Sequence, residues 1–121
     1  MSLLLEDGGQ NIVANAITTT GTQLAFAFSP SRSGLPRTLS FTAQGASGVM
    51  PTTVTANLQS SADGGTTWEN EQTATGMPLV ATSTGLVAVV TNCAAGKQYR
   101  LRVGTLTLGS AASVTIYCAV N

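Results

Sequence analysis

The chain has 121 residues, 43% of them hydrophobic, which is enough for one core and excludes a disordered chain. Five basic and five acidic residues give a formal net charge of zero, and the basic residues are scattered, which argues against a nucleic-acid-binding surface. No apolar segment is long enough for a transmembrane helix, so we expect no membrane contact.

The N-terminal segment 1–10 carries a short apolar run of Leu3, Leu4 and Leu5, followed at once by Glu6 and Asp7. No basic region precedes this run, so it is a poor signal peptide. We expect segment 1–10 to stay on the mature chain as an arm or first strand, ahead of a sandwich domain over 11–121. The three leucines are candidate contacts with a neighbouring protein.

Most of the remaining chain consists of short runs in which every second residue is apolar, the pattern of half-buried strands. The alternating sets are Ile12/Ala14/Ala16, Leu24/Phe26/Phe28, Leu39/Phe41/Ala43, Val54/Ala56/Leu58, Tyr99/Leu101/Val103 and Ala112/Val114/Ile116/Cys118/Val120. The continuous apolar run 86–90 predicts a central strand with both faces covered. No segment shows helical periodicity. About seven to nine strands in one domain predict an all-β antiparallel sandwich, jelly-roll or immunoglobulin-like.

Segment 61–68 predicts a hairpin turn, because glycine reaches positive φ without steric cost and Asp63 can bond to nearby backbone NH groups. Its spacing resembles the Asp-box of sialidases and related β-proteins. That resemblance implies that Ser61 and Asp63 brace the turn and that Trp68 packs under it, away from any active site. The alternative is that Trp68 is an exposed platform that stacks on a sugar ring. The turn residues are Ser61, Asp63, Gly64, Gly65, Thr67 and Trp68.

The segment from Tyr99 to Val103 resembles the sixth strand of fibronectin type III and similar sandwiches, in which a tyrosine near the strand start holds the corner. We interpret the likeness as convergence on strand chemistry. Arg100 and Arg102 alternate with its apolar residues. They are either the solvated face of one strand or a basic ledge for a partner or an acidic sugar.

Two cysteines leave two alternatives open. Cys118 shares its side of a strand with Ile116 and Val120, so it is expected to face inward, and Cys93 follows the apolar run and shares parity with Val89. A disulfide between them would contribute about 3 kcal/mol. Without a secretion signal, a reducing compartment and free buried thiols are the other interpretation. Two cysteines without histidine cannot supply the usual four zinc ligands.

The chain has few groups with which to catalyse a reaction. It contains no histidine, so Ser-His-Asp and Cys-His arrangements are unavailable. Glu69 and Glu71 fit a solubilising pair better than the two facing carboxylates of a glycosidase. Gly8-Gly9 and Gly64-Gly65 open no helix, so neither is a phosphate cradle. We therefore expect no enzyme activity, no cofactor and no metal.

The short, histidine-free β-chain, with its hairpin segment 56–68 and its strand 99–103, resembles small virion structural proteins of tailed bacteriophages. The resemblance implies a capsid decoration (cement) protein, or else a tail or fibre component. It implies the major capsid protein or other virion proteins as partners, a homo-oligomer with a trimer favoured, and a place in the virion after assembly in the host cytoplasm. The low surface charge fits such an assembly.

The sequence is also compatible with two other functions. The first is a tail- or fibre-associated carbohydrate-binding or host-adhesion module, with Trp68, Tyr99 or Tyr117 as stacking platforms. The second is a sandwich domain of a bacterial surface or secreted protein, which predicts an oxidised pair of Cys93 and Cys118.

Overall fold

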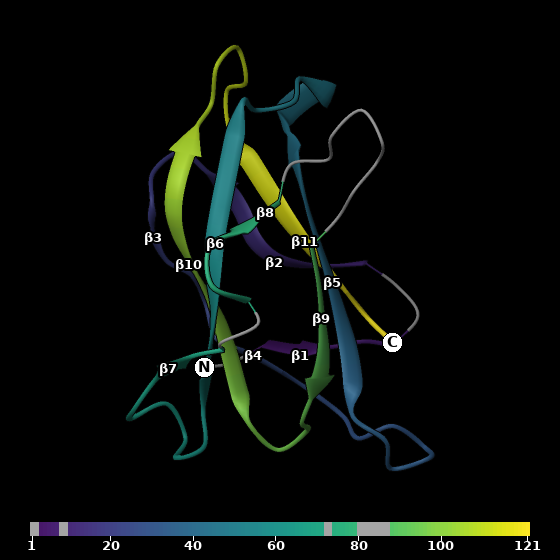
Figure 1. The fold of residues 1–121 in the computed structure, drawn as a ribbon. Coiled ribbons are helices and arrows are strands. Elements are labelled where there is room, and N and C mark those ends of the chain that lie inside the picture. Colours follow the sequence, from purple (N-terminus) through teal and green to yellow (C-terminus); the bar gives the residue numbers. More distant parts are fainter. Residues whose placement is uncertain (1–2, 8–9, 72–73, 80–87) are drawn as a thin grey trace.

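The computed structural model describes residues 3–7, 10–71, 74–79 and 88–121, and it is an all-β sandwich of two sheets packed face to face (Figure 1). Sheet A has the order β1 (Leu3–Leu5), β4 (Phe26–Phe28), β10 (Gln98–Thr107), β6 (Thr53–Ser61) and β7 (Glu69–Asn70), with β3 (Gly21–Thr22) beside β10 and β8 (Met77–Pro78) beside β6. Sheet B has the order β2 (Gln10–Ile17), β11 (Val114–Val120), β5 (Arg37–Gly45) and β9 (Ala88–Cys93). A 3-10 turn, η1 (Ala46–Gly48), follows β5. The predicted fold class is confirmed, and the strand count exceeds the prediction because several strands have only two or three residues.

The core forms where period-2 patterns on the two sheets face each other. Strands β5, β6, β10 and β11 each bury every second side chain over most of their length. An aromatic cluster joins the sheets: Tyr99 stacks on Phe28 with ring centroids 5.3 Å apart, and Phe26 lies 6.4 Å from Phe41 of sheet B. Such rings dominate core energetics because each removes a large apolar area from water.

The alternation predicted around Ile12 is wrong in detail. Val13 and Ala14 are both buried, whereas Ile12 is 45% exposed. The pairing of β2 with β11 shifts register at two points, and Ala16 has a φ of 49°. A bulge of this kind turns successive side chains to the same face of a sheet.

The predicted central strand at 86–90 is also wrong. Strand β9 begins at Ala88 and is an edge of sheet B, with Val89 52% exposed and Val90 buried; Leu86 and Val87 lie outside the described residues. Asn92 has a φ of 61°, and the pairing of β9 with β5 shifts register near it. This irregularity places Cys93 in the core although Val89, of the same parity, faces out.

The N-terminal segment forms the edge strand β1, which pairs in parallel with β4. Leu5 is 2% exposed and belongs to the core of its own chain, so it is not available to a partner in this structure. Leu3 and Leu4 are 38% and 64% exposed. Beyond β1, Asp7 forms a bridge with Val120 of β11, so the segment passes from sheet A to sheet B.

Candidate functional site

The turn between β6 and β7 is held by side-chain bonds to its own backbone. The Ser61 hydroxyl accepts a hydrogen bond from the Gly65 amide at 2.9 Å and donates one to Asp63 Oδ1 at 2.7 Å. Asp63 Oδ1 also accepts from the backbone amides of Thr66 at 3.1 Å and Thr67 at 2.9 Å. Ser61 and Asp63 together therefore supply the acceptors that the tight turn needs.

These bonds keep Asp63 charged. Hydrogen bonds from Thr67 first, then from Ser61 and the Thr66 amide, hold the pKa of the Asp63 carboxyl well below its usual range. Gly64 and Gly65 have φ values of 77° and 96°, in the region that favours glycine. The segment is thus a rigid, prearranged turn.

Trp68 lies half-buried beneath this turn and is covered on one face. Its Nε1 donates to the Gly65 carbonyl oxygen at 3.1 Å, and the Arg100 guanidinium carbon lies 4.1 Å from the ring centroid. Arg100 Nε in turn donates to Gln59 Oε1 at 2.8 Å, and the Gln59 amide donates to Asn70 Oδ1 at 3.0 Å. With a cation on one ring face, Trp68 is poorly suited to receive a sugar there.

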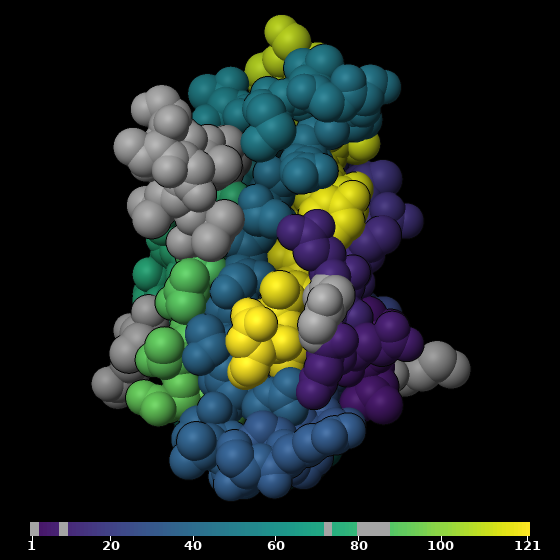
Figure 2. Space-filling view, turned by 90° about the vertical axis from the view of Figure 1, so that its right-hand side faces the viewer, coloured from purple at the N-terminus to yellow at the C-terminus, as the bar shows by residue number. Residues whose placement is uncertain are grey.

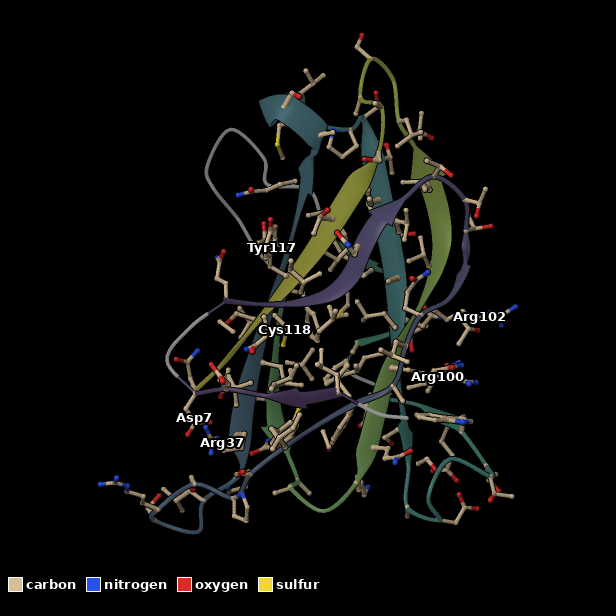
Figure 3. The ribbon with its side chains drawn as sticks, turned by 180° about the vertical axis from the view of Figure 1, so that it is seen from behind. Asp7, Arg37, Arg100, Arg102, Tyr117 and Cys118 are labelled. Atoms are coloured by element: carbon tan, nitrogen blue, oxygen red, sulfur yellow. The ribbon has the colours of Figure 1, made fainter. Side chains whose placement is uncertain are left out.

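Arg100 and Arg102 are not equivalent, although both leave β10 on the same side (Figure 3). Arg100 is half-buried in the network with Trp68 and Gln59, whereas Arg102 is exposed. Arg102 lines a shallow hollow of about 230 Å³ beside β3. Only Arg102 matches the prediction of a solvated strand face, because the Arg100 side chain contacts Gln59 and Trp68 of its own chain.

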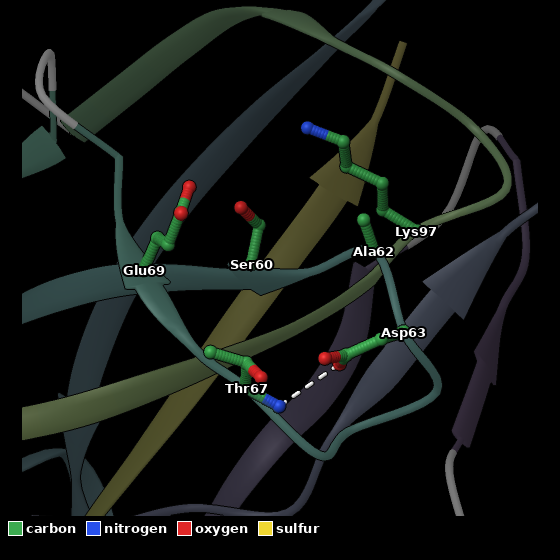
Figure 4. Close-up of a pocket in the computed structure, with 6 residues that line it drawn as sticks. All are labelled: Ser60, Ala62, Asp63, Thr67, Glu69 and Lys97. Atoms are coloured by element: carbon green, nitrogen blue, oxygen red, sulfur yellow. Dashed lines mark hydrogen bonds between the residues drawn. The ribbon is translucent and has the colours of Figure 1, made fainter.

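A pocket of about 310 Å³, here called the hairpin pocket, lies beside the turn (Figure 4). Ser60 and Glu69 are direct partners on the antiparallel strands β6 and β7, so their side chains share one face. The sequence did not single out Ser60 or Lys97. Ser60 could have been recognised, because it lies two residues after Leu58 and therefore continues the inward-facing positions of that strand. The lining residues are Ser60, Ala62, Asp63, Thr67, Glu69 and Lys97.

Tyr99 holds the corner that leads into β10. Its hydroxyl donates to the Ala94 carbonyl oxygen and accepts from the Ala94 amide, both at 3.0 Å, and the residue is 1% exposed. Burial raises the pKa of Tyr99 to about 12. This geometry is the tyrosine corner of sandwich domains. Tyr99 is therefore unavailable as a stacking platform, whereas Tyr117 lies half-buried on the outer side of β11.

Arg37 is a buried arginine that the sequence did not single out. The residue is 3% exposed, and its Nη2 lies 2.6 Å from Asp7 Oδ1 (Figure 3). Its other donors reach the carbonyl oxygens of Ser29 at 2.9 Å and Asn121 at 3.3 Å. One side chain thus joins the N-terminal segment, the end of β4 and the C-terminus.

The two cysteines are buried free thiols. Cys93 lies opposite Arg37 on β5, whereas Cys118 lies opposite Phe41, four residues further along. At about 3.3 Å per residue this offset is roughly 13 Å, beyond the ~7 Å limit between the Cα atoms of a disulfide. Burial raises the pKa of Cys93 to about 11 and that of Cys118 to about 12. This geometry opposes the disulfide alternative.

Within the described ranges, no group of three or more histidine, cysteine, aspartate or glutamate side chains could hold a metal ion. The described part of the chain also contains no helix long and apolar enough to cross a membrane. No protein-family model matches this chain, and neither a curated protein nor a solved structure is detectably similar to it.

Proposed function

We propose that this chain is a structural virion protein of a tailed bacteriophage, a capsid decoration protein that binds between capsid subunits and stabilises the shell. Its partners are the major capsid protein and further copies of itself, in a symmetric oligomer for which a trimer is favoured. Its site of action is the virion, assembled in the host cytoplasm. The resemblance of segments 56–68 and 99–103 to small phage virion proteins supports this class.

The observation that carries the proposal is the outer face of sheet B, here called the uncharged face. The four described strands of sheet B contain one charged residue, Arg37, and that residue is buried. Figure 2 shows these strands side by side on one side of the molecule. The face presents mostly short hydroxyl and apolar side chains, namely Ile12, Thr38, Ser40, Thr42, Val89, Thr115, Tyr117 and Ala119.

Covering a face of this composition with another protein requires little desolvation free energy. Removing a charged side chain from water costs several kcal/mol unless it gains a partner, and the outward side chains of the four described strands carry no charge to desolvate. Cores of protein interfaces are likewise depleted of charged residues. Ile12 and Val89, which are 45% and 52% exposed, add apolar area at its two edges. The uncharged face therefore suits lasting contact with a protein surface.

The test is binding to capsid shells that lack this protein. Wild type is expected to co-sediment with the shells and to raise their melting temperature. Val89→Lys should weaken co-sedimentation, because it places a charge on the uncharged face at an exposed edge. Thr22→Lys, at an exposed strand position of sheet A, is the control and should bind like wild type. A protein that stays monomeric and does not bind such shells would overturn the proposal.

A further inference from the structure

Ser60 is a buried residue whose hydroxyl opens onto the hairpin pocket. The residue is 7% exposed, lies among the pocket's lining residues, and makes no side-chain hydrogen bond to any residue the structure describes. In Figure 4 its hydroxyl points into the space between Glu69 and Lys97. A hydroxyl in this position offers both a donor and an acceptor to a molecule that enters the pocket.

The walls of the pocket carry complementary groups. Glu69 supplies a carboxylate on one side of Ser60, and Lys97 supplies an ammonium group on the other (Figure 4). Neither group forms an ion pair with a described residue. The one ion pair among the described residues joins Arg37 and Asp7, outside the pocket. The pocket thus presents a strong acceptor and a strong donor that do not satisfy each other.

The other lining residues restrict what can bind. Asp63 uses Oδ1 to hold the turn and adds a second negative charge at the rim, so a free anion would meet two carboxylates. A free cation would be repelled by Lys97 but attracted by the two carboxylates, so a cation is the competing ligand that the test below includes. A neutral ligand with neighbouring hydroxyls meets neither penalty, because one hydroxyl can donate to the carboxylate while the next accepts from the ammonium. The Ala62 methyl group is an apolar contact for ring C–H groups.

We propose that the hairpin pocket binds a neutral saccharide unit through two adjacent hydroxyls, with Glu69 as acceptor, Lys97 as donor and Ser60 at the floor. The braced turn fixes the wall formed by Asp63 and Thr67 before the ligand arrives, which reduces the entropy lost on binding. The site requires no stacking on Trp68, which does not line the pocket. It also lies on β6 and β7 of sheet A, away from the uncharged face, so it does not depend on the proposed function.

The test is a titration of the ¹⁵N-labelled protein with glucose, galactose, mannose and N-acetylglucosamine, followed by two-dimensional NMR. At least one sugar is expected to shift the amide signals of Ser60, Thr67, Glu69 and Lys97, with weak, millimolar affinity. Ser60→Ala, Glu69→Gln and Lys97→Gln should each weaken binding roughly fivefold, the equivalent of one lost hydrogen bond. Glu6→Gln and Arg32→Gln, at exposed positions outside the pocket, should leave affinity unchanged.

Three outcomes would overturn the proposal. The first is the absence of shifts at the pocket with all four sugars. The second is sugar binding that the three pocket variants do not weaken. The third is a response to methylammonium or acetate without a response to any sugar, which would make the pocket an ion site. The spectra of the variants also report folding, so loss of binding through unfolding is recognised directly.

Discussion

Arg37 and Asp7 form an ion pair of 2.6 Å that joins the core of the sandwich to its N-terminal segment. The arginine side chain is 4% exposed and the aspartate side chain 59%, so the pair lies at the boundary between core and solvent. The same guanidinium also satisfies two backbone carbonyl oxygens, those of Ser29 and Asn121. Three distant parts of the chain therefore share one buried cation.

Arg37→Ala is expected to lower the free energy of unfolding by about 3–5 kcal/mol, because it removes the partner of several groups and leaves a cavity. Asp7→Asn should cost less, about 1–2 kcal/mol, because Asp7 is largely exposed. Urea denaturation measures both changes. Arg32→Ala, at an exposed loop position, should stay within about 0.5 kcal/mol of wild type. Equal effects at Arg37 and Arg32 would contradict the role given to the buried cation.

The depressed pKa of Asp63 predicts a loss of stability in acid. The folded state binds fewer protons there than the unfolded state, so the contribution of Asp63 is complete above the unfolded pKa of about 3.9 and is lost as the pH falls toward the folded pKa. Asp63→Asn keeps an acceptor oxygen but removes the charge. Its stability should therefore fall less steeply than that of wild type below about pH 4. Parallel curves of melting temperature against pH would be evidence against this account.

Tyr99→Phe should destabilise the fold by about 1–3 kcal/mol, because the Ala94 amide and carbonyl lose their shared hydroxyl partner. Tyr117→Phe is the matched control, since Tyr117 lies half-buried on the outer side of β11. It should change stability by less than about 0.5 kcal/mol. Urea denaturation of the two variants tests the corner, and a larger loss for Tyr117→Phe would argue against it.

Arg100→Ala should cost more stability than Arg102→Ala. The first change removes the bond to Gln59 and the contact with Trp68, together about 1–2 kcal/mol. The second change affects an exposed side chain and should be nearly neutral. Tryptophan fluorescence gives a second measurement, since only Arg100→Ala should alter the emission of the single Trp68. Identical unfolding curves and spectra would show that the network is unimportant.

Cys93 and Cys118 should not react with a thiol reagent in the native protein. Their burial and raised pKa values leave almost no thiolate at neutral pH. We expect both thiols to be labelled only when the protein is unfolded in denaturant. Mass spectrometry of native material should show two free thiols. An intramolecular disulfide in that material would contradict the strand register and favour the secreted-domain interpretation.

The sequence determined the parts of the fold that depend on local chemistry. Alternation of apolar residues in β5, β6, β10 and β11 fixed which side chains face the core, because successive strand residues point to opposite faces. The turn at Asp63 and Gly64 could be read from residue type, since positive φ and Asx hydrogen bonds are local properties.

Only the tertiary structure decided the rest, because it depends on which strands become neighbours. An apolar run looks the same at an edge as at the centre of a sheet, so Val89 could not be placed from sequence. The burial of Arg37 requires carbonyl oxygens from distant residues, and the hairpin pocket requires Lys97, in the turn before β10, to lie near Ser60 of β6 and Glu69 of β7. Contacts of this kind, between residues far apart in the sequence, arise from packing and strand order, which no local pattern encodes.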